Sequence, residues 1–199
     1  MSELIRTFVA IELDDATRRV LGSLQSKLQA ELGLDAVRWV APQNIHLTLK
    51  FIGDVDAVRG SVSALEHAVA DAGIGVAPFV LRLSGVGAFP NVTRPNNVWV
   101  GVQGEIEQAA RLAQNIEDAC ALLGFPREGR AFEPHLTLGR VKRDTGARER
   151  AEIAQMIASA PTRELGSYRV ARVSLIRSEL RPTGSVYSQL AIIRLLPTP

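Results

Sequence analysis

The tetrapeptide His-Leu-Thr-Leu occurs twice in this chain, and the duplication constrains the fold more than any other feature of the sequence. The copies are His46–Leu49 and His135–Leu138, 89 positions apart (135 minus 46). At ordinary amino-acid usage a given His begins this tetrapeptide roughly once in two thousand times. Two of the three His in the chain do so. Because chance explains this poorly, the copies indicate two similar structural units.

Each copy has the alternation of a half-buried β-strand. Side chains alternate between the two faces of a strand with period 2. We therefore expect His46, Thr48 and Lys50 on one face and the apolar residues that alternate with them, as far as Phe51, on the other. The second copy places His135 and Thr137 on one face in the same way. If both Leu faces are buried, two imidazoles and two hydroxyls open onto one cleft.

Strand and helix patterns interleave along the chain, without a Gly-rich nucleotide fingerprint and without a linker-like tract. We expect strands near residues 7–13, 37–40, 44–52, 79–83, 98–102, 135–141, 169–176 and 186–195. We expect helices near residues 14–32, 57–72, 105–123 and 147–160. Each half then contains a helix, an HLTL strand and a second helix. This weak repeat predicts an α+β fold with two similar lobes whose sheets face a shared cleft.

Composition narrows the classes of protein that remain. The formal net charge is only +2 over 199 residues, which excludes a grossly basic polyanion binder but leaves room for a local positive cleft. Cys120 is the single cysteine, so an intramolecular disulfide and a cysteine-based zinc site are excluded, and we expect its thiol to pack in the core. No apolar run approaches the roughly 20 residues needed to cross a bilayer, and the amino terminus lacks a secretory signal. We therefore expect a cytoplasmic protein that does not contact a membrane.

Two imidazoles and two hydroxyls around one volume suit phosphodiester cleavage without a metal. A neutral His takes a proton from water while a protonated His gives one to the departing oxygen, and imidazole titrates close enough to neutrality for both tasks. Thr48 and Thr137 can donate hydrogen bonds to the non-bridging phosphate oxygens. Placing His46 and His135 on opposite sides of phosphorus fits an in-line displacement. The spacing leaves open which His is the acid and which is the base.

A zinc site is the competing interpretation of these histidines. Such a site needs three or four protein ligands at suitable spacing. The only other His is His67, which lies on a predicted helix without a partner motif. We expect His67 to be an ordinary helix-surface residue, and we expect no metal at this site.

The paired tetrapeptides resemble the two HxTx motifs of the 2H phosphoesterase superfamily, and within it the RNA 2′,3′-cyclic phosphodiesterases, historically called 2′-5′ RNA ligases. Further segments match in order over nearly the whole chain: residues 6–11, 39–53, 85–90, 98–102, 130–138, 178–180, Gly184 and Tyr187. The resemblance implies one 2H phosphoesterase domain over residues 1–199. This domain would consist of two interleaved, pseudo-symmetric lobes, with antiparallel sheets facing a central cleft and helices on the outside.

The resemblance also implies roles and a substrate. His46 would protonate the leaving 3′ oxygen and His135 would activate the attacking water, which leaves a 2′-phosphomonoester. No metal or nucleotide cofactor would be required. The substrate would be RNA with a 2′,3′-cyclic phosphate end, such as a tRNA fragment, or a small cyclic nucleotide, and we expect the protein to act as a monomer.

Four further residues are candidates for substrate binding. Arg130 corresponds to an arginine of the family pattern and could clamp a phosphate through its planar fork of donors. Phe132 could stack on a base or fill the core. Lys50 is expected to add positive potential on the face of His46, and Tyr187 is expected to line the groove.

The sequence leaves two rival functions open. A 2′-5′ RNA ligase would run essentially the reverse reaction at the same site. A non-catalytic RNA-binding module would keep the groove but would be expected to lose one motif His, whereas both are present.

Overall fold

The computed structural model describes residues 4–56, 61–182 and 184–197, and these residues form two antiparallel sheets. The four-stranded sheet, which we call the β1 sheet, has the order β3 (His46–Asp56), β1 (Leu4–Glu12), β8 (Arg172–Arg181), β9 (Gly184–Arg194). The five-stranded sheet, which we call the β6 sheet, has the order β2 (Val37–Trp39), β6 (His135–Val141), β5 (Asn97–Gly104), β4 (Phe79–Phe89), β7 (Glu164–Val170). Neighbouring strands are antiparallel throughout both sheets.

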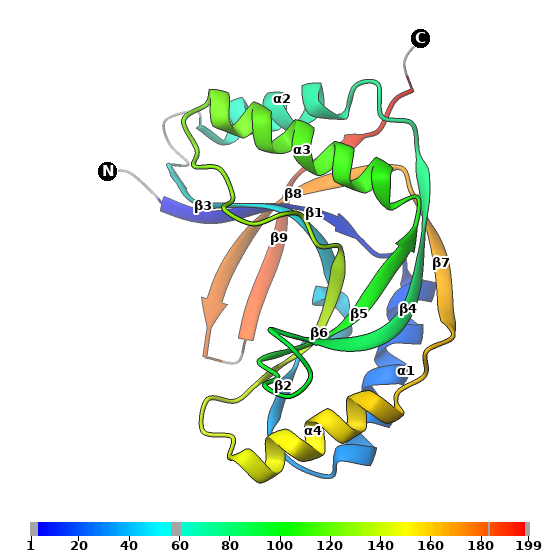
Figure 1. Cartoon of the computed structure of the whole chain (residues 1–199). Helices are drawn as coiled ribbons and strands as arrows, with labels where there is room; N and C mark the ends of the chain where they lie inside the picture. The colour runs from blue at the N-terminus through cyan, green and yellow to red at the C-terminus, as the bar shows by residue number, and fades with distance from the viewer. Residues whose placement is uncertain (1–3, 57–60, 183, 198–199) are drawn as a thin grey trace.

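Each sheet is covered by two helices, as Figure 1 shows. Helices α2 (Ser61–Gly73) and α3 (Ile106–Leu122) pack on the β1 sheet, and helices α1 (Asp15–Leu32) and α4 (Ala147–Ser159) pack on the β6 sheet. The two lobes, each a sheet with its helices, confirm the predicted bilobal α+β fold. Within the described ranges, no helix combines the length and the apolarity that a membrane crossing requires.

The helices form where local sequence signals, such as capping residues, coincide with an apolar face. The carboxylate of Asp14 caps α1 by accepting a hydrogen bond from the backbone nitrogen of Thr17 at 2.7 Å, and Gly33 ends this helix in the left-handed conformation at φ 63°. Helix α3 buries an apolar stripe that includes Leu112, Ile116 and Cys120. Burial raises the pKa of the Cys120 thiol to about 11. The prediction that Cys120 packs in the core is confirmed.

The chain passes between the lobes many times. It leaves one lobe for the other after β1, after the short helix η1 (Pro42–Asn44), after α2, after β5, after α3 and after β7. The two lobes are therefore interleaved along the sequence. That residues 1–199 make a single domain stays a prediction, and this interleaving favours it.

Two predicted strands differ markedly from the structure. The strand predicted over 169–176 is wrong, because β7 ends at Val170 and β8 begins at Arg172 in the other sheet. Strand-favouring residues continue through this crossing, so the pattern shows no break. Strand β4 continues to Phe89 through the stretch predicted as turn-rich, and Gly85 at φ 69° accommodates its bulge. The predicted start of the second helix at residues 57–60 lies outside the described residues.

Candidate active site

The two HLTL strands lie where the lobes meet, with β3 in contact with β6. Residues directly opposite in an antiparallel pair share a face. His46 lies opposite Glu12 on β1, and Thr48 lies opposite Ala10. His135 lies opposite Gly101 on β5, and Thr137 opposite Trp99. Each motif therefore presents its His and Thr on one face of its sheet, as predicted.

A β-bulge follows the Thr of each motif. In β3, Thr48 pairs with Ala10 and Lys50 pairs with Val9, the next residue of β1, so Leu49 is left without a partner. In β6, Leu138 is left without a partner in the same way. An extra residue in one strand reverses the alternation of faces beyond it. The two motifs thus share a change of register as well as a tetrapeptide.

The bulge in β3 changes the face of the sheet on which Lys50 lies. Because Lys50 pairs with Val9, its side chain lies on the helix-covered face of the sheet, not on the face of His46. Only 1% of it is exposed, and its Nζ lies 2.9 Å from Glu117 Oε2 and donates to the carbonyl oxygen of Pro126 at 2.9 Å. The sequence prediction of Lys50 as a groove residue is wrong, because strict period-2 alternation fails at a bulge.

Phe51 takes the place on the groove face that was expected for Lys50. It pairs with Phe8, its ring lies 6.1 Å from the ring of Phe8, and 54% of Phe51 is exposed. The period-2 alternation predicts Phe51 on the buried face, and that prediction is wrong because of the same bulge. A large exposed aromatic side chain in a groove offers a stacking surface.

The imidazoles of His46 and His135 are both oriented by a hydrogen bond at Nδ1. Nδ1 of His46 lies 2.7 Å from the carbonyl oxygen of Asn44, and Nδ1 of His135 lies 2.7 Å from the carbonyl oxygen of Glu133. A carbonyl oxygen only accepts hydrogen bonds, so Nδ1 is the donor in both rings. This leaves Nε2 of each ring to bind or release a proton. No sequence signal reveals this contact, because any residue supplies a backbone carbonyl.

Aromatic rings hold the imidazoles in place. Phe8 stacks on His46 with centroids 4.7 Å apart and an interplanar angle of 27°. Tyr187 meets the same imidazole edge-on at 5.4 Å. In the other lobe Phe89 meets His135 edge-on at 4.8 Å. The structure thus places Tyr187 beside His46, whereas Phe8 and Phe89 were not singled out from the sequence.

The surroundings of His46 lower the pKa of its imidazole. Burial is the largest cause; the Asn44 carbonyl and the Glu12 carboxylate oppose it, and the positive charges of Arg140 and His135 reinforce it. Because the charge of His135 acts on His46, the two rings lie within electrostatic reach of each other. The two distant motif histidines are therefore brought to one region.

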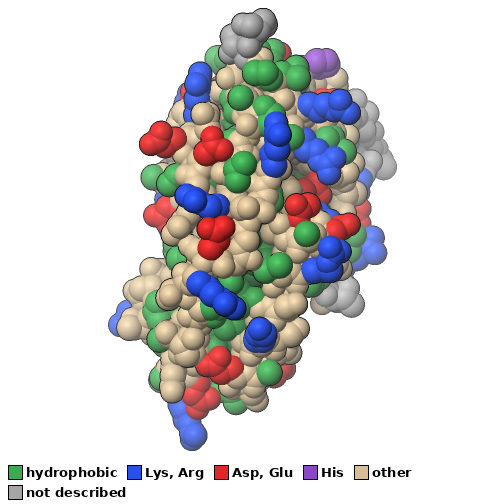
Figure 2. Space-filling model, turned by 90° about the vertical axis from the view of Figure 1, so that its right-hand side faces the viewer, with side chains coloured by type: hydrophobic (Ala, Val, Ile, Leu, Met, Phe, Trp, Pro, Cys, Tyr) green, Lys and Arg blue, Asp and Glu red, His purple; other side chains and the backbone are tan. Residues whose placement is uncertain are grey.

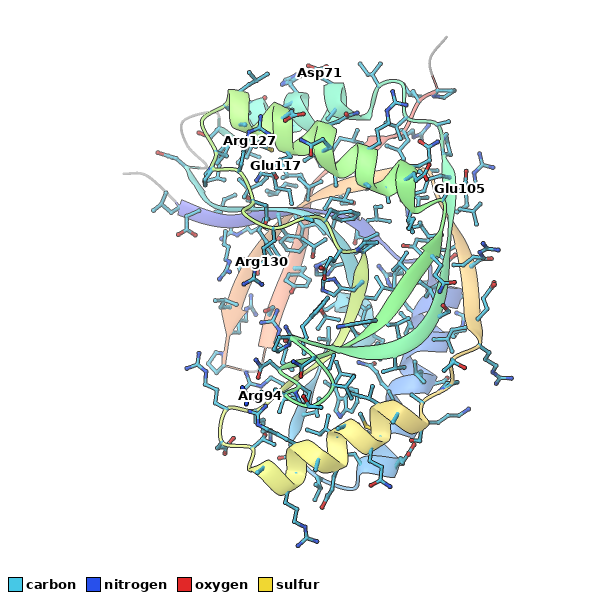
Figure 3. The ribbon with its side chains drawn as sticks, in the orientation of Figure 1. Asp71, Arg94, Glu105, Glu117, Arg127 and Arg130 are labelled. Atoms are coloured by element: carbon cyan, nitrogen blue, oxygen red, sulfur yellow. The ribbon has the colours of Figure 1, made fainter. Side chains whose placement is uncertain are left out.

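A groove of about 900 Å³ runs beside the motif strands and is lined by residues of both lobes. Its lining includes Thr48, Phe51, Arg130, Phe132 and His135. His46 is not part of that lining but occupies the same face of β3, two positions before Thr48. Arg130 is exposed, and Figure 3 shows it on the side of β3 away from α3. In the described part of the chain its guanidinium has no ion pair or hydrogen bond, which leaves it available to an anion.

The segment that carries Arg130 is anchored to β3 on the side of the sheet that α3 covers. Figure 3 shows Glu117 on the side of α3 that faces this segment. Besides pairing with Lys50, Glu117 accepts a hydrogen bond from the backbone nitrogen of Glu128 at 2.8 Å. The Glu128 carboxylate in turn accepts one from the backbone nitrogen of Phe51 at 3.2 Å. We call these residues, with Pro126, the Lys50 network; it joins an HLTL strand to the segment that leads to Arg130.

The third histidine lies apart from the site. His67 is exposed on α2, where its Nδ1 lies 2.8 Å from the Ser63 carbonyl oxygen, so it is the helix-surface residue predicted. Across the described ranges, no group of three or more His, Cys, Asp or Glu side chains is arranged to hold a metal ion.

Comparisons with known proteins agree with this geometry. A family profile described as LigT like Phosphoesterase matches the chain twice, at residues 11–100 and 100–187, with one HLTL copy in each match. The chain is 38% identical over 192 residues to the RNA 2′,3′-cyclic phosphodiesterase of Methanothermobacter thermautotrophicus, covering 96% of this chain and 99% of that protein. It is similar to the crystal structure of TT0787 of Thermus thermophilus, with a TM-score of 0.76, 29% identity, and coverage of 96% and 98%. It is also similar to the crystal structure of E. coli LigT complexed with 3′-AMP, with a TM-score of 0.76, 27% identity, and coverage of 97% and 99%.

The fold and the paired motifs define a two-lobed phosphoesterase. The chain belongs to the LigT-like phosphoesterase family, which is the 2H family that its motifs resemble. Its general class of activity is that of a phosphodiesterase.

Proposed function

We propose that this protein hydrolyses 2′,3′-cyclic phosphate ends of RNA to 2′-phosphomonoesters without a metal, with His46 and His135 as the acid–base pair. The observation that carries the proposal is the matched orientation of two imidazoles. Each is held through Nδ1 by a backbone carbonyl, and the two lie within electrostatic reach across one groove. The substrate is supported by relatives named RNA 2′,3′-cyclic phosphodiesterase.

In the proposed reaction, Nε2 of His135 takes a proton from water as the water oxygen attacks phosphorus. The bond from phosphorus to the 3′ oxygen breaks, and Nε2 of His46 gives its proton to that oxygen. The phosphate then remains on the 2′ oxygen. Thr48 and Thr137 donate hydrogen bonds to the non-bridging oxygens, and Arg130 pairs with the same anion.

The assignment of His46 as the acid comes from the family resemblance, and the electrostatics of the groove alone oppose it. Burial favours the neutral form of His46, whereas a proton donor must start protonated. A cyclic phosphodiester carries one negative charge, and a nearby anion raises the pKa of an imidazole. We propose that substrate binding reverses the balance and protonates His46.

Product analysis tests this function. The protein is incubated with an oligoribonucleotide that ends in a 2′,3′-cyclic phosphate, and the position of the product phosphate is read by phosphorus NMR. We expect the 2′-phosphomonoester. No hydrolysis would contradict the function, and a 3′-phosphomonoester would contradict the assignment of the 3′ oxygen as the leaving group.

We predict that a chelator leaves this activity unchanged. The acid, the base and the hydrogen-bond donors of the proposed reaction are all side chains of the protein. Initial rates are compared with and without excess EDTA after extensive dialysis. Strong inhibition that is restored by added Zn²⁺ would favour the metal interpretation of the histidines.

Joining two RNA ends through a 2′-5′ bond would use the same groups in reverse. Water is in large excess over any RNA hydroxyl, so we propose that hydrolysis dominates unless the RNA ends are held together. Small cyclic nucleotides are a second substrate class for the same site. We propose that the protein acts as a monomer, because both His-Thr pairs of the site come from one chain.

A further inference from the structure

The side chain of Glu12 lies beside the imidazole of His46. The two residues are directly opposite each other on β1 and β3. Such cross-strand partners share a face, with their Cβ atoms about 4.5–5.5 Å apart. Nδ1 of His46 donates to the Asn44 carbonyl oxygen, so Glu12 does not orient the ring through that nitrogen. Its negative charge instead acts through space, where it favours the protonated imidazole.

Side chains from three other elements hold the Glu12 carboxylate in place. Its Oε2 accepts a hydrogen bond from Ser174 Oγ of β8 at 2.6 Å and another from Gln189 Nε2 of β9. Its Oε1 lies 3.8 Å from Nη2 of Arg18 on helix α1. Only 24% of the Glu12 side chain is exposed, so water screens its charge incompletely.

The charges that reach His46 from the other lobe oppose Glu12. Arg140 and His135, both on β6, lower the pKa of the His46 imidazole, whereas the Glu12 carboxylate raises it. Tyr187 of β9 is the titratable side chain that meets the same ring, edge-on at 5.4 Å. Within this set of neighbours Glu12 supplies the negative charge, and it therefore counteracts both burial and the cations of β6.

The outer surface on the β7 side does not supply a comparable field. Figure 2 shows the side of the molecule toward which β7 lies in Figure 1, and basic and acidic side chains are mixed over it. Exposed charges of both signs partly cancel, and salt screens them beyond about 8–10 Å. On this side of the molecule, the protonation of His46 therefore depends on its nearest charges.

We propose that Glu12 is a positioning residue that keeps His46 protonated, so that Nε2 of this ring can give its proton to the leaving oxygen. The proposal rests on the proposed function, in which His46 is the acid. A proton donor must start protonated, and burial opposes this because it lowers the pKa of the imidazole. Glu12 supplies a permanent negative charge, and the substrate phosphate adds a second one on binding.

The test is the variant Glu12→Gln, which removes the charge and keeps an amide oxygen that can accept the hydrogen bonds of Ser174 and Gln189. The titration of each imidazole is followed by proton–carbon NMR of its Cε1–H group, in the protein without substrate. The titration midpoint of His46 should move to lower pH, because the protonated ring loses a stabilising charge. The midpoint of His67, exposed on α2, should not move.

Two substrates separate an effect on the acid from a structural effect. On an oligoribonucleotide with a 2′,3′-cyclic phosphate end, Glu12→Gln should lower kcat by about tenfold, less than the loss of the acid itself. The second substrate is a phosphodiester with p-nitrophenolate as leaving group, which departs without a proton. On this substrate the variant should keep the wild-type kcat, whereas a distorted groove would lower both activities.

Asp15→Asn is the matched control. Its Oδ1 lies 3.4 Å from Nη1 of Arg18, so Asp15 contacts the same arginine as Glu12, but 83% of its side chain is exposed and it lies on α1. The variant changes the net charge by the same amount and also deprives Arg18 of a carboxylate. We expect it to leave the titration midpoint of His46 and both activities unchanged.

Three results would overturn the role of Glu12. They are an unchanged midpoint of His46 in Glu12→Gln, an equal shift in Asp15→Asn, and an equal fall of both activities in Glu12→Gln. Failure of the proposed function is a different result: the wild type would then not hydrolyse the oligoribonucleotide. The NMR titration needs no activity, so it still shows in that case whether Glu12 favours the protonated ring.

Discussion

Replacing His46 or His135 with Ala should reduce kcat for hydrolysis of a cyclic-phosphate oligoribonucleotide by about a hundredfold to ten-thousandfold, the usual contribution of one general acid or base. Each change removes the Nε2 that we propose to transfer a proton on its side of the groove. The two effects should not add in the double variant, because both groups act in one step. The measurement is the initial rate of hydrolysis at saturating substrate. His67→Ala, which alters the exposed imidazole on α2, is the control and should behave as wild type.

A generic phosphodiester with p-nitrophenolate as leaving group separates the two roles. This leaving group departs without a proton, so it makes a general acid unnecessary. If His46 is the acid, His46→Ala retains a larger fraction of wild-type activity on this substrate than His135→Ala does. The reverse result would exchange the roles, and full activity of both variants on the RNA substrate would reject the acid–base pair altogether.

The second large effect is expected from Lys50→Met, which should lower the free energy of unfolding by about 3–5 kcal/mol. The change leaves the Glu117 carboxylate without its cation at a position where only 14% of that side chain is exposed. It also removes the donor to the Pro126 carbonyl. The free energy is measured by urea denaturation. The double variant Lys50→Met, Glu117→Gln should recover part of the loss, because no unpaired charge then remains buried.

Arg148→Met is the matched control for this prediction. Arg148 pairs with Glu152 on the surface of α4, with 92% of its side chain exposed, so its removal should change the free energy of unfolding by less than about 1 kcal/mol. Equal losses in Lys50→Met and Arg148→Met would show that the Lys50 network contributes no more than a surface ion pair.

The duplicated motif, together with the interleaved strand and helix patterns, predicted the bilobal α+β fold that the structure shows. His and Thr share a face in each motif strand, as period-2 alternation requires, and the rest of the chain supplies the helices that cover the Leu faces. The same reasoning brought His46 and His135 to one groove, because two copies of one strand pattern are most simply explained by two equivalent lobes.

The residues that were misplaced lie beyond the point where the alternation changes. Leu49 and Leu138 look like ordinary strand residues, so no local pattern marks the bulges that follow each Thr. A bulge depends on how a strand pairs with its neighbour, and the strand's own sequence does not show this pairing. For this reason Lys50 was expected in the groove, and Phe51 was assigned to the core.

The contacts that orient the imidazoles could not be predicted either. The carbonyls of Asn44 and Glu133 are backbone groups, and the rings of Phe8 and Phe89 come from strands far away in the sequence. These contacts exist only once the sheets have formed.

The repeated passage of the chain between the lobes bears on how substrate can enter. Two lobes joined by a single linker can swing about a hinge and close over a ligand. In this protein such a swing would have to bend the connections after β1, η1, α2, β5, α3 and β7 together. We therefore expect the entrance to the groove to keep a nearly constant width. The flexible end of a single RNA strand enters it, whereas a stiff duplex does not.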